Sequence, residues 1–171
     1  GNSEKIELSG DNIPAERYSH SMVAIGSNMY IFGGISNGNP ANDLYKIDTL
    51  GSCKKIPLTF NDRPSTRYDY SMVVIGNKMY IFGGFGHELH KKDLYEIDTS
   101  GNCKKITLQG GDDDIPSPRY THTMVAIGNY MYVFGGQNHT SGLSPNDLYK
   151  IDTLGSCKKI PLSGSDSDRP S

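Results

Sequence analysis

A six-residue stretch occurs three times along the chain and constrains its fold more than any other feature. Met29-Tyr30-Ile31-Phe32-Gly33-Gly34 recurs at 79–84 and, with Val in place of Ile, at 131–136. A nearly constant period of this length is typical of repeat proteins, in which each repeat is one supersecondary unit. Strand-favouring residues run into two glycines in every copy, so we expect a β-strand followed by a sharp change of backbone direction.

Each copy lies within a unit that predicts four short strands joined by hairpins. In the first unit they cover residues 19–25, 29–34, 43–48 and 53–58, and the other two units follow the same plan. The 20 glycines, nine prolines and 11 tyrosines favour short strands and turns over helices. One such sheet has two apolar faces, and sheets stacked around an axis bury both. The sequence therefore predicts an all-β chain, a β-propeller with three four-stranded blades whose first strands lie nearest the axis.

The repeats also predict where the blades begin and end. We expect blades at 17–58, 67–108 and 119–162. Residues 1–10 align with 101–110, which predicts that they are the last strand of a preceding blade. Residues 163–171 would begin the loop to a next blade.

The motifs of this unit resemble the kelch repeat. Its elements are Pro-x-x-Arg-Tyr-x-His, a Gly-Gly pair and Asn-Asp-Leu-Tyr-x-Ile-Asp-Thr, which occur here from Pro14 to His20, at Gly33-Gly34 and from Asn42 to Thr49. Phased copies follow in the other two units, so the resemblance covers essentially the whole chain. The chain departs from the kelch pattern where that pattern has Trp, because it carries Cys53, Cys103 and Cys157 there. The resemblance implies kelch blades that act as a protein-interaction scaffold.

The blades are of two kinds. Residues 42–58 and 146–162 are identical, whereas the middle unit differs at several of these positions. The middle unit also has Tyr70 where the outer units have His20 and His122. The chain thus has the order A-B-A.

Three blades are fewer than the four to eight that close a propeller. Two explanations stay open: the chain is a segment of a longer alternating array with six blades in all, or two copies close a six-bladed ring head to tail. The phase favours the segment. In a dimer, residues 5–8 and 157–162 would compete for the same sheet edge.

Binding residues are expected in the loops, because propeller strands form the scaffold. The loops after the Gly-Gly pairs diverge while the strands around them are almost identical, which favours one loop-bearing face as the place where a partner docks. Drift in unconstrained loops remains the alternative. Arg67 also has counterparts in Arg17 and Arg119, and this repetition favours a structural role for all three. The candidate partner-binding residues are Asn37, Asn39, Arg63, Arg67, His87, Glu88, His90, Asn138 and His139.

The sequence does not predict catalytic, cofactor-binding or metal-binding residues. His20 and His122 favour structural histidines over a metal site, since Tyr70 interrupts the set. The formal net charge of −2 does not favour nucleic acid, and no apolar run is long enough to span a membrane. The leading hypothesis is a cytoplasmic, non-enzymatic scaffold or adaptor with a protein partner. The alternatives are a kelch-type enzyme acting on a small sugar-like molecule and an architectural subunit of a larger assembly.

Overall fold

The structure is a computed structural model, which describes residues 1–59, 61–87, 90–138 and 146–162. It confirms an all-β fold of blade-like sheets, with one short 3-10 turn, η1 (Asp112–Asp114), in the described residues. Blade 1 is the sheet β2 (Ser21–Ile25), β3 (Asn28–Phe32), β6 (Leu44–Asp48), β7 (Cys53–Ile56). Blade 2 is β8 (Ser71–Ile75), β9 (Lys78–Phe82), β10 (Leu94–Asp98), β11 (Cys103–Ile106). Blade 3 is β12 (Thr123–Ile127), β13 (Tyr130–Phe134), β14 (Leu148–Asp152), β15 (Cys157–Ile160).

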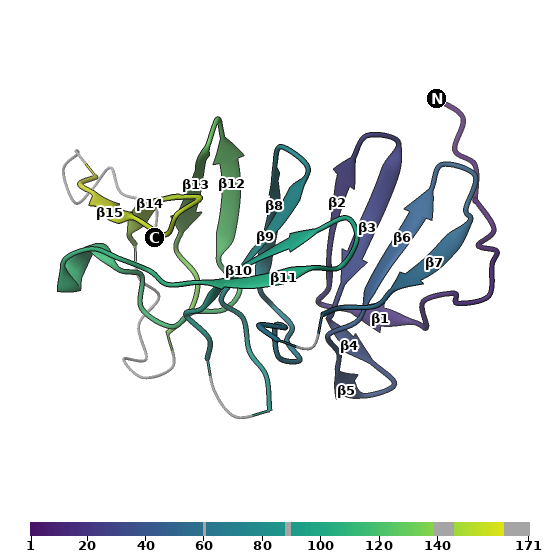
Figure 1. Cartoon of the computed structure of the whole chain (residues 1–171), viewed down its shortest axis with the longest axis horizontal. Helices are drawn as coiled ribbons and strands as arrows, with labels where there is room; N and C mark the ends of the chain where they lie inside the picture. The colour runs from purple at the N-terminus through teal and green to yellow at the C-terminus, as the bar shows by residue number, and fades with distance from the viewer. Residues whose placement is uncertain (60, 88–89, 139–145, 163–171) are drawn as a thin grey trace.

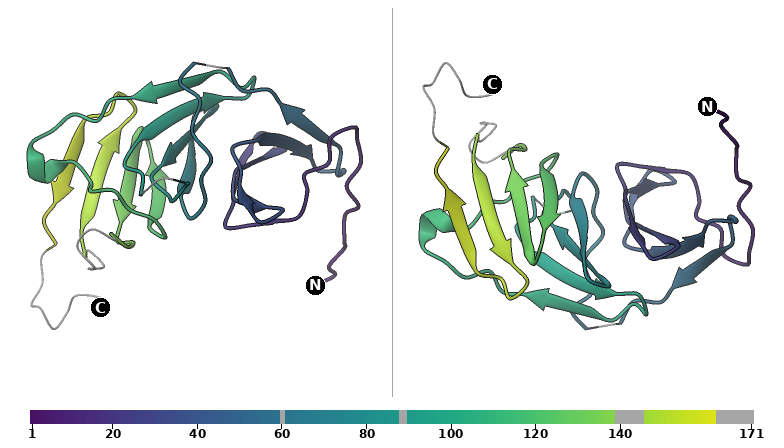
Figure 2. Two further views of the ribbon diagram at one scale, coloured as in Figure 1. Left: turned by 90° about the horizontal axis from the view of Figure 1, so that it is seen from below. Right: turned by 90° about the horizontal axis from the view of Figure 1, so that it is seen from above.

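The three blades stand side by side in an arc. Each is antiparallel, with its strands in chain order across the sheet. The arc and its concave side are visible along the molecule in Figure 2. The first strands β2, β8 and β12 are neighbours, as expected for strands nearest the axis. The last strands β7, β11 and β15 form the outer edges and carry exposed lysine pairs, which discourage pairing with other sheets.

Strand periodicity builds an apolar core at each blade junction. On β9, Met79 and Ile81 point to the core shared with blade 1, whereas Tyr80 and Phe82 point to the core shared with blade 3. Successive side chains of a strand alternate between its faces, so one strand serves both cores. Blade 2 is therefore buried on both sides.

The Gly-Gly pair joins neighbouring blades. Gly34 donates its backbone N–H to the Arg67 carbonyl at 2.9 Å, and Gly84 donates to the Arg119 carbonyl at 2.9 Å. Both glycines of the pair in blade 2 have positive φ, and a Cβ on Gly83 would lie 2.7 Å from the carbonyl oxygen of Arg119. The repeated glycines are thus required by backbone conformation and by the close approach of the next blade.

The N-terminal residues lie along the outer edge of blade 1. Residues 1–8 belong to no described sheet, while Ser9 forms a parallel bridge with Ser52. The same bridge joins Gln109 to Ser156 at blade 3. The equivalence places residues 1–8 where the last strand of another blade would be, and their membership of such a blade stays a prediction. Residues 163–171, expected to lead to a next blade, lie outside the described residues.

Candidate functional site

One face of the arc carries the loops that follow the Gly-Gly pairs and the segments that precede each first strand, at the bottom of Figure 1. In blade 1 these segments form a small sheet of β1 (Arg17–Tyr18), β4 (Ile35–Ser36) and β5 (Asn39–Pro40). In blade 2, isolated bridges join Phe85 to Tyr68 and to His90, and in blade 3 one joins Tyr120 to Gln137. We call this side the loop face. Its loops are held by backbone pairing at their bases.

The three repeated arginines hold each blade together from within. Arg67 donates through Nη1 to the Gly83 carbonyl at 3.0 Å and to Asp93 Oδ1 at 2.8 Å, and its guanidinium stacks on Tyr95. Arg17 and Arg119 make equivalent contacts in their own blades. Arg67 is 0% exposed. The assignment of Arg67 as a candidate surface residue is therefore corrected, because its side chain is buried within the blade. The same structural contacts explain why every copy of the repeat has this arginine.

The acidic partner of the first of these arginines shows the strength of the pairing. Desolvation alone would raise the pKa of Asp43. The hydrogen bond and positive charge of Arg17 outweigh it and lower that pKa below its usual value. Charge-assisted, two-pronged pairs of this kind fix geometry as well as charge.

An aromatic cluster lies at the base of the loops of blades 2 and 3. Tyr68 and Phe85 have ring centroids 5.3 Å apart, and Phe85 packs edge-on against His90 at 5.0 Å. Tyr120 lies 5.1 Å from His90 and donates its hydroxyl to Gln137 Oε1 at 2.6 Å. All of these rings are partly exposed. We call Tyr68, Phe85, His90 and Tyr120 the aromatic patch.

Sequence reasoning predicted only His90 of this patch. The Arg-Tyr pair in each repeat contains Tyr68 and Tyr120. In the sequence this pair was interpreted only as part of the kelch motif, not as a binding feature. Phe85 follows its Gly-Gly pair directly, at a position that varies between repeats. Because the members are separated by up to 52 residues in sequence, only the packing of two blades brings them together.

The other predicted residues are spread over the face. Asn37 and Asn39 are exposed at the tip of the blade 1 loop, where Asn39 Nδ2 donates to the Asn37 carbonyl at 3.0 Å. Arg63 and His87 are exposed, and Asn138 is partly buried. Glu88 and His139 lie outside the described residues. The structure thus brings His90 into an aromatic cluster, and it describes no single cluster that unites the remaining candidates.

The histidine of blade 3 is a buried structural residue of an unusual kind. His122 is 6% exposed and packs edge-on against Phe82 at 5.4 Å. Neither of its ring nitrogens has a hydrogen-bond partner in the described part of the chain. Burial, aided by the charge of Arg119, lowers the pKa of His122 to about 4 despite the nearby Phe82 carbonyl. His122 is therefore neutral at physiological pH.

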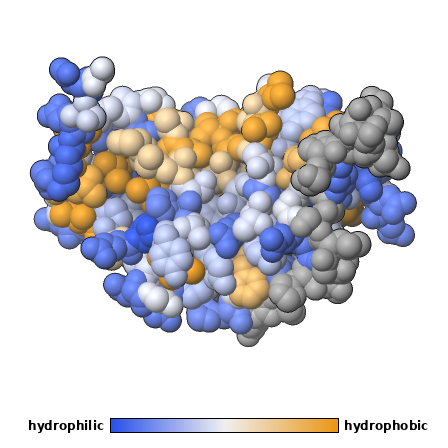
Figure 3. Space-filling model, turned by 180° about the vertical axis from the view of Figure 1, so that it is seen from behind, coloured by the Kyte–Doolittle hydropathy of each residue, from blue (hydrophilic) through white to orange (hydrophobic). Residues whose placement is uncertain are grey.

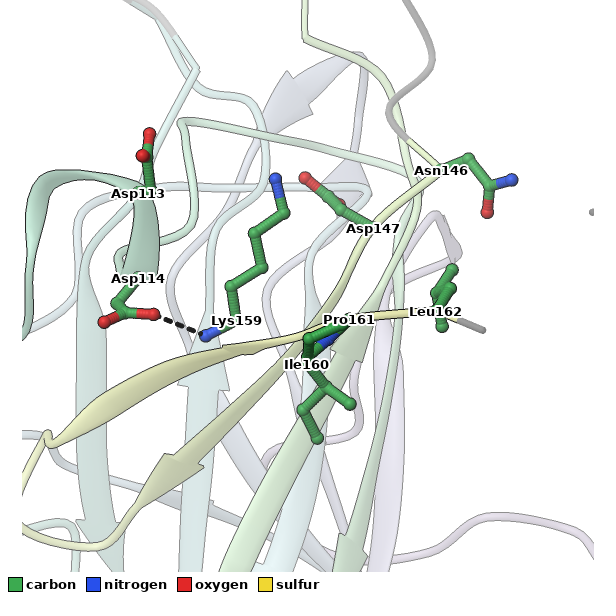
Figure 4. Close-up of a pocket in the computed structure, with 8 residues that line it drawn as sticks. All are labelled: Asp113, Asp114, Asn146, Asp147, Lys159, Ile160, Pro161 and Leu162. Carbon is green, nitrogen blue, oxygen red and sulfur yellow. Dashed lines mark hydrogen bonds between the residues drawn. The ribbon is translucent and has the colours of Figure 1, made fainter. Parts of the chain in front are cut away.

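A shallow pocket of about 480 Å³ lies at the outer edge of blade 3 (Figure 4). Asp114 of η1 accepts the backbone N–H of Lys159 at 3.0 Å and the side-chain amine of Lys158 at 3.0 Å. The hydrogen bond from the Lys159 backbone N–H, and after it the one from the Lys158 side chain, lower the pKa of Asp114. The carboxylate thereby satisfies a backbone donor on the edge strand β15, so Asp114 has a structural role.

The described residues contain no group of three or more His, Cys, Asp or Glu side chains arranged to hold a metal ion. All three cysteines are free thiols. Burial raises the pKa of the Cys157 thiol to about 11, which makes this thiol a poor nucleophile. Among the helices described, none has the length and apolar character needed to cross a membrane.

Four-stranded antiparallel blades in an arc, joined through Gly-Gly pairs and locked by internal Arg–Asp pairs, define a β-propeller-type repeat protein. The chain matches the model of the KLHDC2/KLHL20/DRC7 Kelch-repeats domain over residues 2–159, and it belongs to the kelch-repeat family. Kelch domains generally mediate protein interactions without catalysis. No curated protein matches the chain.

Proposed function

We propose that the chain is a non-enzymatic interaction scaffold that binds a protein partner on its loop face. The main support is the contrast between near-identical strands and divergent loops: residues 42–58 and 146–162 are identical, yet the loops at 35–41 and 137–145 share almost nothing. A scaffold that tolerates such different loops leaves them available for recognition.

The chemistry of the loop face fits a polypeptide partner. Exposed Asn37 and Asn39 offer amide groups and Arg63 offers a cation. The aromatic patch offers a stacking surface at the loops of blades 2 and 3. Aromatic and arginine side chains are the types most enriched at protein interfaces. The net charge of −2 does not favour nucleic acid as the ligand. The cytoplasm is the proposed location.

The test is quantitative affinity capture with the full chain as bait. A loop-face variant, Asn37→Ala/Asn39→Ala/Arg63→Ala, is compared with an outer-edge control, Lys54→Ala/Lys104→Ala/Lys158→Ala. We expect specific proteins that the wild type and the control retain and the loop-face variant loses. Binding of each captured protein is then measured by titrating it, in purified form, against the purified chain. We expect the loop-face variant to bind it at least about tenfold more weakly than the wild type does.

Equal capture by the loop-face variant and the wild type would contradict the proposal. The enzymatic alternative makes a separate prediction, namely a small sugar-like ligand at the axis in contact with His20 or His122. Saturable binding of such a compound, lost on His20→Ala, would favour that alternative.

A further inference from the structure

Among the residues that the structure describes, the arc ends in two sheet faces with no neighbouring blade packed on them. On blade 3, Val125 is 48% exposed and Phe134 38%, whereas the equivalent residues of blade 2, Val73 and Phe82, are 8% and 0% exposed. Ile127 is exposed as well. Apolar side chains that are core residues at one blade therefore face water at the next.

The opposite end of the arc has the complementary exposure. Met22 on blade 1 is 53% exposed, while Met72 and Met124 at the equivalent positions are both 6% exposed. Seen from behind Figure 1, apolar surface forms a band across the molecule above the more polar loops (Figure 3). Continuous apolar surface of this kind is uncommon on soluble monomers and marks association sites.

The face that blade 3 presents is the same as the face that blade 2 buries. Blade 2 uses seven side chains against blade 3, and blade 3 carries the identical residue types at the equivalent positions. The pairs are Val73 and Val125, Ile75 and Ile127, Tyr80 and Tyr132, Phe82 and Phe134, Leu94 and Leu148, Ile106 and Ile160, Leu108 and Leu162.

Blade 1 repeats the receiving side of that junction. Blade 3 receives blade 2 with seven such side chains, and all but one have identical counterparts on the open side of blade 1. The pairs are Met124 and Met22, Ala126 and Ala24, Met131 and Met29, Tyr149 and Tyr45, Ile151 and Ile47, Cys157 and Cys53, with Val133 replaced by Ile31. His122 also has its counterpart in His20.

We propose that these two faces bind each other in a second copy of the chain, so that two copies close a six-bladed ring head to tail. Blade 3 of one copy would pack on blade 1 of the other and reproduce the junction between blades 2 and 3 almost residue for residue. An interface of this heterologous type forms twice in a closed pair. It leaves the loop face free, so it stands or falls independently of the proposed scaffold function.

Backbone groups near the axis support the same docking. Asp69 donates its N–H to the Ser19 carbonyl at 3.2 Å, and Thr121 donates to the Asp69 carbonyl at 2.8 Å. All three residues have positive φ. In the ring, Ser19 would donate to the carbonyl of Thr121 in the second copy and continue the series.

The N-terminal segment must leave its place for the ring to close. A Cβ on Gly51 would lie 2.4 Å from the Glu7 carbonyl, just as one on Gly155 would lie 2.3 Å from the Thr107 carbonyl. Residues 1–8 thus occupy the position that β15 of the second copy would take. Since β15 is paired with β14 along its whole length and residues 1–8 pair with no strand, β15 displaces them.

The experiment measures the mass of the full chain by sedimentation over a range of concentrations. We expect a reversible monomer–dimer equilibrium. Val125→Glu places a charge in one open face and Met22→Lys in the other, and each should weaken the dimer about a hundredfold or more. Leu154→Glu, which adds the same charge to an exposed turn of blade 3, is the matched control and should leave the dimer unchanged.

Mixing the two disabled variants separates this geometry from others. In a mixed pair of Val125→Glu and Met22→Lys chains, one junction is wild type on both sides and the other joins Glu to Lys. We expect the mixture to recover dimers that neither variant forms alone. Removal of residues 1–8 should tighten the dimer severalfold.

Several outcomes would overturn the proposal. They are a wild-type chain that stays monomeric at high concentration, open oligomers larger than a dimer, no recovery in the mixture, or a weaker dimer without residues 1–8. The last result would mean that residues 1–8 form part of the docking surface, as they would if a different blade preceded them. Circular dichroism of each variant separates loss of association from loss of folding.

Discussion

Each of the two blade junctions has an apolar core, but the junctions differ at one position close to the axis. Between blades 1 and 2, Tyr70 is buried, donates its hydroxyl to the Phe32 carbonyl and accepts the Ser21 N–H at 3.0 Å. Between blades 2 and 3, His122 takes the same place against Phe82 and makes no such bonds. One junction is therefore closed by a hydrogen-bonded phenol and the other by a neutral, unpaired imidazole.

Near-identical repeats therefore need not form equally stable junctions. A buried polar group that lacks a partner costs free energy, and the imidazole can also gain a proton. We expect the junction of blades 2 and 3 to be the weaker one, above all in acid. Substitutions at each junction and a change of pH should therefore reveal the difference.

The largest effect should be the same at both junctions. Phe32→Ala and Phe82→Ala each remove a fully buried ring, and we expect each to lower the free energy of unfolding by about 3–5 kcal/mol. Urea unfolding measures both. Values that differ by more than about 1 kcal/mol would show that the apolar cores are not equivalent and would break the comparison.

Acid should separate the junctions next. His122 has a pKa of about 4 in the folded chain, below the ordinary value of 6.5. The unfolded chain therefore binds more protons between pH 6.5 and 4, so the contribution of His122 to stability is complete above pH 6.5 and is lost as the pH falls through this window. The loss amounts to about 3 kcal/mol at most.

The measurement is urea unfolding of the wild type and of His122→Tyr between pH 7 and 4.5. We expect the difference in stability between the two proteins to grow as the pH falls. His20→Gln serves as the control for the histidine on the open face. A difference that does not change with pH would contradict an unprotonated, buried His122.

Removing the polar atoms should affect the junctions in opposite ways. Tyr70→Phe leaves the Ser21 N–H and the Phe32 carbonyl without the hydroxyl, so we expect a loss of about 1–3 kcal/mol. His122→Phe removes two unpaired nitrogens and should be neutral or stabilising. Thermal unfolding at pH 7 compares them, and equal losses would refute the assignment of hydrogen bonds.

The smallest effect should come from making the junctions alike. His122→Tyr would place a hydroxyl next to the Phe82 carbonyl and the Ser71 N–H, as Tyr70 does one blade earlier. We expect a gain of about 1 kcal/mol at pH 7, measured by the same thermal unfolding. A destabilised variant would indicate that the pocket of blade 3 cannot hold the larger ring.

The sequence predicted the fold well because the information is local and repeated. Each Met-Tyr-Ile-Phe-Gly-Gly stretch carries its own strand pattern and its own turn, and three phased copies identify the class of repeat. The all-β blade architecture and the kelch family are confirmed. The Gly-Gly pair was understood as a conformational requirement, and its contact with the carbonyl of the next blade appeared only in the structure.

The candidate site was less predictable for a physical reason. The repetition of Arg67 favoured a structural role, yet Arg67 also stood among the candidate binding residues. Its guanidinium turns inward to Asp93, 26 residues away. The aromatic patch needs Tyr68 and Tyr120 from two blades, and no local pattern shows that blades 2 and 3 place them together. A residue that recurs in every repeat is therefore first a candidate for a structural role, as the equivalent internal contacts of the three arginines illustrate.

The period, the strands, the alternation of blade types and the identity of the side chains on each blade face follow from the amino-acid sequence alone. The packing of the blades showed that the arginines are internal, that His122 lacks the hydrogen bonds of Tyr70, and that Ile6 and Glu7 lie against Gly51. The division has one cause. Strand and turn preferences act between residues near in sequence, whereas burial and pairing depend on blades whose equivalent residues are about 50 positions apart.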